Sequence, residues 1–306
     1  MAIYTCGHKI PDSDSICSAI SLAYLLNKLG RKAVPARQGE LNPESRFILE
    51  TFGHEAPMLK TSFANEELYI VDYSDLAQAP DDINEANIIG IVDHHKLGDI
   101  TTSSPLECWI RPLGCSSTVL KQMYDFYKID IPKDIAGLML GAILSDTIIF
   151  KSPTCTQDDI KAVRDLAKLA KIDDFKAFGM KMFEIKSQVE NASASELVKR
   201  DYKDFNMHGQ KIGIGQLELI DASVLDERHN ELKKELELLR QEEGLHTAIL
   251  LLTDIMKEGS TVLVSSNQED IFEKAFNVKL EASTVWLDAC LSRKKQIIPF
   301  LEPAFK

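Results

Sequence analysis

Apolar residues in the first half of the chain fall into short continuous runs and longer helical repeats. Residues 2–6 form a short β-rich run, and apolar side chains recur at helical spacing between residues 13 and 29. Two later runs, residues 68–71 and 88–92, are continuously apolar, and each is followed by an aspartate. Runs of this kind are typical of strands that are covered on both faces. The pattern therefore predicts a parallel sheet packed between helices.

The rest of this half repeats the alternation up to a small, polar stretch. We predict further strands at residues 32–37 and 108–111, and helices at residues 43–51, 116–127, 131–144, 156–170 and 173–189. The sequence Asn-Ala-Ser-Ala-Ser at residues 191–195 is the best linker candidate. It predicts an N-terminal domain over residues 1–188, a linker over residues 189–195 and a C-terminal domain over residues 196–306.

The pattern changes after this stretch. We predict strands at residues 211–219, 246–252 and 260–265, and helices at residues 224–243 and 268–276. The expected fold class is therefore α/β. It combines a Rossmann-like parallel sheet flanked by helices with a smaller C-terminal α/β domain that has a mixed sheet.

Composition narrows the functional classes. The 306 residues, 44% of them hydrophobic, can form two domains with sizeable cores. The formal net charge of -12 disfavours a nucleic-acid binder, which normally has a basic face. The six cysteines are dispersed without a C-x-x-C pair, the N-terminus has no secretory signal, and the longest apolar region, residues 135–150, is too short for a membrane span. We therefore expect a soluble, cytoplasmic protein that acts on neither nucleic acid nor membrane.

Side chains that can bind metal follow several of the predicted elements. They are His8, Asp12, Asp14, Asp72, His94 and Asp146. In an open α/β sheet, ligands gather at the carboxyl ends of the strands. Six mixed nitrogen and oxygen ligands exceed the need of one metal beside a substrate, so two cations that share a bridging carboxylate are the simplest interpretation. Imidazole beside carboxylate suits Mn²⁺ or Co²⁺ better than Mg²⁺.

Each of these residues also has a purely structural interpretation. Asp12 and Asp14 can stabilise the N-terminus of a helix, and Asp72 can form a turn after its strand. A single histidine such as His94 is more often structural than a metal ligand. Three polar residues in a row after a buried strand, Asp-His-His at residues 93–95, nevertheless need partners. The coincidence of four such segments in one chain favours metal binding.

A basic run near the C-terminus is the second candidate site. Arg293, Lys294 and Lys295 are consecutive in an otherwise acidic chain. The default interpretation of three basic residues is a solvated charge run. Apolar residues on both sides of the run instead indicate that part of it lines a cleft, where arginine and lysine would bind phosphate. Lys203, which follows the linker, can join this cluster, although it is uninformative alone.

Five sequence motifs together resemble family II inorganic pyrophosphatases, the manganese-dependent members of the DHH phosphoesterase superfamily. They are Gly-His-x-x-Pro-Asp-x-Asp at residues 7–14, Val-Asp-Tyr at 71–73, Asp-His-His at 93–95, Ser-Asp-Thr at 145–147 and Ser-Arg-Lys-Lys-Gln at 292–296. The first four are shared across the superfamily and specify its fold and metal chemistry. The terminal motif, with Lys203, points to pyrophosphate.

The resemblance implies a role for each residue. One metal is assigned to His8, Asp12 and Asp72, and the second to Asp14, Asp72, His94 and Asp146, so that Asp72 bridges the two ions. The substrate phosphates are assigned to His95, Lys203, Arg293 and Lys294. The implied cofactors are two Mn²⁺ per subunit, with Co²⁺ as a possible substitute, and Mg²⁺ that arrives with the substrate.

The resemblance also implies a reaction. A water that bridges the two metals attacks pyrophosphate between the two domains and yields two orthophosphates, with His95 as a hydrogen-bonding partner of the phosphates. The family members of this short type are commonly homodimers, and the chain has no room for the nucleotide-binding insert of longer relatives. One departure is Ala289, where the family often has glycine.

Three alternative functions remain open. An exopolyphosphatase of the same superfamily would share the metal site but would need an open channel for a long chain. A nuclease relative is disfavoured because no Gly-Gly pair occurs in the sequence. A catalytically silent metal-binding regulator is disfavoured because no ligand position is missing.

Overall fold

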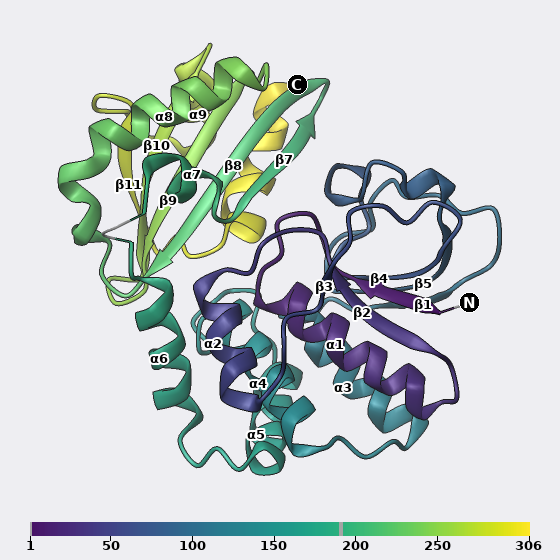
Figure 1. Cartoon of the computed structure of the whole chain (residues 1–306). Coiled ribbons are helices and arrows are strands. Elements are labelled where there is room, and N and C mark those ends of the chain that lie inside the picture. Colours follow the sequence, from purple (N-terminus) through teal and green to yellow (C-terminus); the bar gives the residue numbers. More distant parts are fainter. Residues whose placement is uncertain (1, 190–191) are drawn as a thin grey trace. The chain divides into compact units, whose positions relative to one another are not determined.

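The computed structural model describes residues 2–189 and 192–306 of the chain. It divides into two compact units, of which the first ends at Ile185 and the second runs from Lys186 to Lys306 (Figure 1). The predicted linker, residues 189–195, falls within the second unit, and its residues 190 and 191 lie outside the described residues. Ser193 caps a short helix, α7 (Ala194–Lys199), so part of the small, polar stretch is the start of a helix.

The first unit is built on a six-stranded sheet. Its strands are β1 (Ile3–Cys6), β2 (Ala33–Arg37), β3 (Met58–Leu59), β4 (Glu67–Val71), β5 (Asn87–Asp93) and β6 (Glu107–Ile110). All are parallel, in the order β3-β2-β1-β4-β5-β6, which confirms the predicted parallel sheet. The chain leaves β1 toward β2 on one side and later returns to β4 on the other. In sheets of this type, ligands bind at the carboxyl ends of the strands where the strand order reverses, which here is beside β1 and β4.

Helices cover mainly one face of this sheet. They are α1 (Ser13–Lys28), α2 (Pro43–Phe52), α3 (Ser116–Tyr127), α4 (Lys133–Asp146), α5 (Gln157–Ala170) and α6 (Phe175–Lys186). The larger core joins Val71 and Val92 of the sheet to apolar residues of α1, α3, α4 and α5. A smaller core on the other face contains Phe63, Tyr73 and Ile83. The short helices η1 (Leu76–Gln78) and η2 (Ile83–Glu85) follow β4, and η2 contributes Ile83 to this core.

The turn between β1 and α1 is fixed by its own residues. The Asp12 carboxylate accepts a hydrogen bond of 2.9 Å from the backbone N–H of Ser15 and so caps α1. A Cβ atom added to Gly7 would lie 2.6 Å from the side chain of Ser15. Glycine is therefore required where β1 passes the start of α1, and His8 follows it directly.

The second unit is built on a five-stranded mixed sheet, as the sequence predicts. Its strands are β7 (Tyr202–Met207), β8 (Gln210–Leu219), β9 (Thr247–Asp254), β10 (Gly259–Ser266) and β11 (Thr284–Asp288), in the order β11-β10-β9-β8-β7. Strands β8 and β9 are parallel, and the other neighbours are antiparallel. The strands β7 and β11 were not predicted. Both lie at the edges of the sheet, where partial burial leaves no clear apolar alternation.

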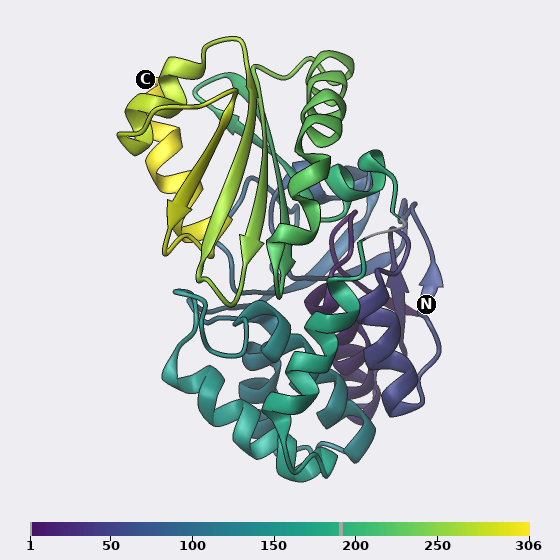
Figure 2. The ribbon, with the colours of Figure 1, turned by 90° about the vertical axis from the view of Figure 1, so that its left-hand side faces the viewer.

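Helices lie on both faces of the mixed sheet. They are α7, η3 (Ala222–Arg228), α8 (His229–Glu242) and α9 (Glu269–Phe276), followed by the C-terminal turns η4 (Arg293–Ile297), α10 (Ile298–Leu301) and η5 (Glu302–Phe305). One core joins α7 and α8 to the sheet, and another joins α9 and α10 to its opposite face. Figure 2 shows the green helix α8 and the yellow C-terminal turns on the two sides of the sheet.

The helices and the cysteines bear on the prediction of a soluble, cytoplasmic protein. Within the described residues, no helix combines the length and apolar character needed to cross a membrane. All six cysteines are free thiols.

Candidate metal centre

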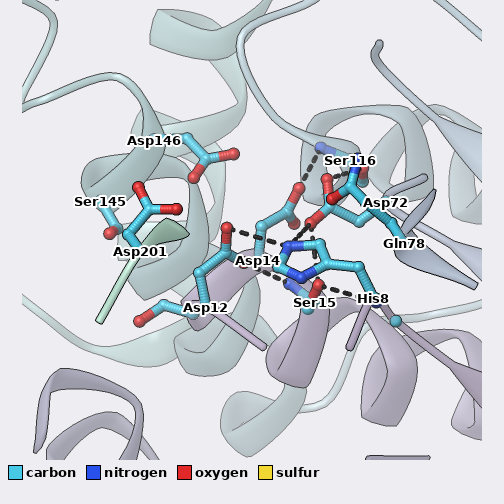
Figure 3. Close-up of polar contacts among 12 residues, drawn as sticks. His8, Asp12, Asp14, Ser15, Asp72, Gln78, Ser116, Ser145, Asp146 and Asp201 are labelled. Carbon is cyan, nitrogen blue, oxygen red and sulfur yellow. Dashed lines mark hydrogen bonds and ion pairs between the residues drawn. The ribbon is translucent and has the colours of Figure 1, made fainter. Parts of the chain in front are cut away.

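Histidine and aspartate side chains meet where three neighbouring strands end. His8 follows β1, Asp72 follows β4, and His94 follows β5. Figure 3 shows His8, Asp12, Asp14 and Asp72 turned toward one another, with Asp146 nearby. All six side chains that the sequence assigns to metal lie in this part of the first unit, within three groups of potential ligand atoms.

The first group surrounds His8. Its Nε2 atom lies 3.3 Å from Oδ2 of Asp12 and 3.3 Å from Oδ2 of Asp72. His8 and Asp72 are buried, whereas the Asp12 side chain is one-third exposed. Asp12 therefore has two roles: one oxygen caps α1, as the structural interpretation expects, and the other faces the imidazole of His8.

The second group consists of Asp72, His94 and His95, and His94 also contacts Asp146 of the third group. The Nε2 atom of His94 lies 3.4 Å from Oδ1 of Asp72 and 3.7 Å from Oδ2 of Asp146. The opposite ring nitrogen, Nδ1, lies 3.0 Å from the carbonyl oxygen of Leu113, which can only accept a hydrogen bond. This contact favours the proton on Nδ1 and leaves Nε2 as a ligand, an arrangement common to metal-binding histidines.

Asp72 stands between the two groups. Its two carboxylate oxygens face different imidazoles, Oδ2 toward His8 and Oδ1 toward His94. Hydroxyl groups orient it further, because Ser15 donates to Oδ2 at 2.9 Å and Ser116 donates to Oδ1 at 3.2 Å. The backbone of Asp72 is left-handed, with φ at +66°, a conformation that aspartate tolerates better than most residues. Each oxygen is thus available to a different cation.

Asp14 belongs to α1, and its fully buried carboxylate lies against the N-terminus of α3. Its carboxylate accepts the backbone N–H groups of Ser116 and Ser117 at 2.7 and 3.1 Å, and the hydroxyl of Ser18 at 2.6 Å. Ligand atoms of Asp14, Asp146 and Cys115 lie within 4.8 Å of one another and form the third group. Asp14 therefore adds its negative charge next to Asp146.

The carboxylates strongly influence one another. Burial and the nearby charge of Asp72 raise the pKa of Asp14 to about 6. Burial would also raise the pKa of Asp72, but the imidazoles of His8, His94 and His95 hold it well below its usual range. Buried like charges are costly unless a cation offsets them. The donor set of imidazoles and carboxylates fits Mn²⁺, and Asp72 offers an oxygen to each of its two parts.

Metal removal should therefore destabilise the protein. With free Mn²⁺ at a hundredfold excess over its dissociation constant, binding at a single site adds about 2.7 kcal/mol to the free energy of unfolding. For a unit of this size, this corresponds to a melting temperature roughly 5–10 °C higher than that of the chelated protein. Calorimetry at constant ionic strength measures the difference, and equal melting temperatures with and without Mn²⁺ would contradict a metal centre here.

His95 is held by Asp93, a residue to which the sequence assigned no separate role. Asp93 is fully buried, and its Oδ1 atom accepts the backbone N–H groups of His94 and His95 and lies 2.8 Å from Nδ1 of His95. This contact fixes Nδ1 as the protonated nitrogen and leaves Nε2 of His95 for other partners. The place of Asp93 in the triplet was the only sequence signal for this role.

The basic run lies in the second unit, and its members differ in exposure. Arg293 is buried: its guanidinium donates to the backbone oxygens of Asp201 and Ile214 at 2.7 and 2.9 Å, and to Oδ1 of Asp201 at 2.9 Å. Lys203 of β7 pairs with Ile214 of β8, so it lies in the same part of this unit as Arg293. Lys294 is half-buried and Lys295 is exposed. The solvated-run interpretation therefore fits Lys295 and is wrong for Arg293.

The motif around Arg293 is held by two glutamines. The Gln296 side chain accepts the N–H groups of Leu291 and Ser292 at 2.9 and 3.0 Å and donates to the carbonyl of Ala289 at 2.6 Å. Gln216 of β8 accepts the N–H of Arg293 at 3.2 Å and donates to the carbonyl of Leu291 at 3.1 Å. These bonds fix the backbone that carries Arg293.

Ala289 has a left-handed backbone, with φ at +53°. Glycine adopts this conformation without the steric cost that alanine has, which explains the glycine expected at this place. Ala289→Gly should therefore raise the free energy of unfolding by roughly 0.5–1 kcal/mol. Ala275→Gly, in the helix α9, is the matched control and should lower it by about 1 kcal/mol. Urea unfolding compares the two variants, and a loss of stability in Ala289→Gly would contradict the argument.

Each of the two units matches a known protein family. Residues 2–143 match the model of the DHH family, N-terminal domain, and residues 180–304 match that of the DHHA2 domain. A probable manganese-dependent inorganic pyrophosphatase from Archaeoglobus fulgidus is 45% identical, over 99% of this chain and 98% of the relative. A manganese-dependent inorganic pyrophosphatase from Methanocaldococcus jannaschii is 43% identical, over 99% of both chains.

Solved structures show the same relationship. A crystal structure described as a family II inorganic pyrophosphatase of Methanococcus jannaschii superposes with a TM-score of 0.93 at 42% identity, over 99% of both chains. An exopolyphosphatase-related protein from Bacteroides fragilis shares only the fold, with a TM-score of 0.53 at 12% identity, over 99% of this chain and 91% of the other. The family resemblance read from the five motifs is thus confirmed, and the chain belongs to the manganese-dependent family II inorganic pyrophosphatases of the DHH superfamily.

Proposed function

We propose that this protein hydrolyses inorganic pyrophosphate to two orthophosphates and depends on Mn²⁺. The observation that carries the proposal is similarity to named manganese-dependent pyrophosphatases over 99% of the chain, which includes both the metal residues and the basic motif. The likeness to the exopolyphosphatase-related structure is too distant to favour that alternative substrate.

The proposed metal ligands are drawn from the three groups of the first unit. His8, Asp12 and Asp72, which form one group, hold one Mn²⁺. Asp14, Asp72, His94 and Asp146, taken from the other two groups without His95 and Cys115, hold the second. Two bound cations that share a carboxylate would acidify a bridging water and offset charge on the phosphates. Co²⁺ can replace Mn²⁺ in such a donor set, and we propose that Mg²⁺ enters with the substrate.

The proposed phosphate-binding residues are His95, Lys203, Arg293 and Lys294. Asp93 orients His95 so that its Nε2 atom can contact a phosphate oxygen and, when protonated, donate a proton to the leaving group. The three hydrogen bonds of Arg293 leave further guanidinium N–H groups for phosphate. The positive charges of Lys203, Arg293 and Lys294 stabilise the negative charge that develops on the transferred and leaving phosphoryl groups.

We propose residues 1–188 as the catalytic domain, residues 189–195 as the linker and residues 196–306 as the substrate-binding domain. The proposed metal ligands lie in the catalytic domain, and most of the proposed phosphate-binding residues lie in the substrate-binding domain. Both domains would therefore hold the same pyrophosphate during turnover.

Phosphate release tests the proposal directly. Purified protein with Mn²⁺ should release two orthophosphates for each pyrophosphate consumed, and chelation of the metal should abolish release. No release above that of Mn²⁺ alone would refute the proposed activity.

We further propose a cytoplasmic homodimer. The six free thiols are consistent with a reducing compartment. Strand β6 is an edge of the described six-stranded sheet, and it carries Trp109, whose ring packs 5.3 Å from that of Phe126, itself 66% exposed. A free strand edge beside exposed aromatic rings is suited to pairing with a second copy. Light scattering should give twice the chain mass of 34.3 kDa; the monomer mass would contradict the dimer.

A further inference from the structure

Glu44 is a buried carboxylate next to the metal centre that no motif included. It lies in the first turn of α2 and is only 1% exposed. Its Oε2 atom accepts the hydroxyl of Ser13 at 2.7 Å and the hydroxyl of Ser145 at 2.8 Å. One oxygen atom therefore connects three segments that are far apart in the sequence.

Each of the two serines is a neighbour of proposed metal ligands. Ser13 stands between Asp12 and Asp14 in the turn that begins α1, and Ser145 precedes Asp146 at the end of α4. Figure 3 shows Ser145 beside Asp146. The hydrogen bonds to Glu44 thus fix the distance between two segments whose carboxylates must reach the same cation.

A purely structural role explains this arrangement less well. Burying a carboxylate is costly, and two buried serines could be replaced by alanines that need no partner. The negative charge is instead located where it assists cation binding, and the N-terminus of α2 favours an acidic side chain in its first turn. Hydrogen bonds to a charged acceptor are also stronger than those between neutral groups.

We propose that Glu44 is a positioning residue of the metal centre. Through Ser13 and Ser145 it holds the Asp12–Asp14 turn and Asp146 in register, and its charge increases the affinity for Mn²⁺. The inference rests on the proposed two-metal site but not on which phosphate compound is hydrolysed. Groups that hold ligands in this way commonly change metal affinity about 10- to 100-fold when they are altered.

Titration calorimetry of the metal-free, full-length protein with Mn²⁺ tests the proposal. Glu44→Gln, which removes the charge but keeps the shape, should weaken Mn²⁺ binding at least about tenfold. The matched control is Glu50→Gln, the same charge change on an exposed residue of α2, and it should bind within about twofold of the unaltered protein. Unchanged binding by Glu44→Gln would overturn the proposal.

A second measurement separates positioning from stability. The absorption spectrum of bound Co²⁺ depends on ligand geometry, so Glu44→Gln and Ser145→Ala should both change it. Loss of stability in the metal-free protein with unchanged Mn²⁺ affinity and Co²⁺ spectrum would show a merely structural role and overturn the proposal. If Glu44→Gln does not fold, Ser145→Ala provides the test. This variant should bind Mn²⁺ more weakly at one of the two sites. Affinities equal to those of the unaltered protein at both sites would overturn the proposal.

These readouts use no substrate. A protein that fails to cleave pyrophosphate but loses Mn²⁺ affinity in Glu44→Gln would refute the proposed activity and support the role of Glu44. If the protein cleaves pyrophosphate and Glu44→Gln keeps its Mn²⁺ affinity, the result would support the proposed activity and refute the role of Glu44.

Discussion

Asp72→Asn should remove both Mn²⁺ ions from the protein at once. The two oxygens of Asp72 face His8 and His94 separately, so no other side chain of the proposed ligand set belongs to both sites. Asparagine keeps the size of the side chain and tolerates the left-handed backbone at this position, so the fold should persist. Replacement of a shared ligand should weaken Mn²⁺ binding more than about a hundredfold, and turnover should fall with it.

Metal analysis after gel filtration, combined with circular dichroism, measures this effect. Asp130→Asn, an exposed position in the same unit, serves as a control and should retain two Mn²⁺ per chain. A variant Asp72→Asn that retained one Mn²⁺ at normal affinity would contradict the bridging role and would restrict Asp72 to a single site.

Arg293→Ala should leave both Mn²⁺ ions in place and lower turnover by about 10²- to 10³-fold. Arg293 belongs to the second unit, and its guanidinium is oriented by Asp201 and by backbone oxygens. The expected loss arises because the variant lacks the guanidinium charge that would stabilise the phosphates in the transition state, and only the more flexible Lys203 and Lys294 remain. Arg293→Lys keeps the charge but not the fork of N–H groups, so only part of the activity should return.

The neighbouring Lys295 provides the matched control. It belongs to the same motif but is exposed, so Lys295→Ala should change turnover by less than about twofold. Steady-state kinetics with measured metal content compares the three variants. Unchanged kinetics in Arg293→Ala would remove the basic motif from the mechanism.

The gathering of the histidine and aspartate side chains at the candidate metal centre could be largely predicted because several of them follow regular strands. His8, Asp72 and His94 come after apolar runs, and parallel strands bring their carboxyl ends to one edge of the sheet. The apolar pattern alone could not show that Asp72 lies between the two histidines, which only the family resemblance implied. That position depends on the strand order, in which β4 lies between β1 and β5.

Residues that support the site could not be predicted in the same way. Glu44 meets Ser13 and Ser145 across 31 and 101 positions of the chain, and no local pattern marks such contacts. The same holds for Asp201 and Arg293, which are 92 positions apart. Burial also divides the basic run, since it is the fold that buries Arg293 and leaves Lys295 exposed.

The proposed two-metal centre and the basic motif are expected to act together on pyrophosphate. The most direct test is the release of orthophosphate by the Mn²⁺-loaded protein from pyrophosphate, long-chain polyphosphate and a dinucleotide at equal concentrations. We predict that kcat/KM for pyrophosphate exceeds the other two values by at least about a hundredfold, because the proposed metal ligands and the proposed phosphate-binding residues Arg293, Lys294 and Lys203 would suit a short substrate. A higher kcat/KM for polyphosphate or for the dinucleotide would contradict this expectation.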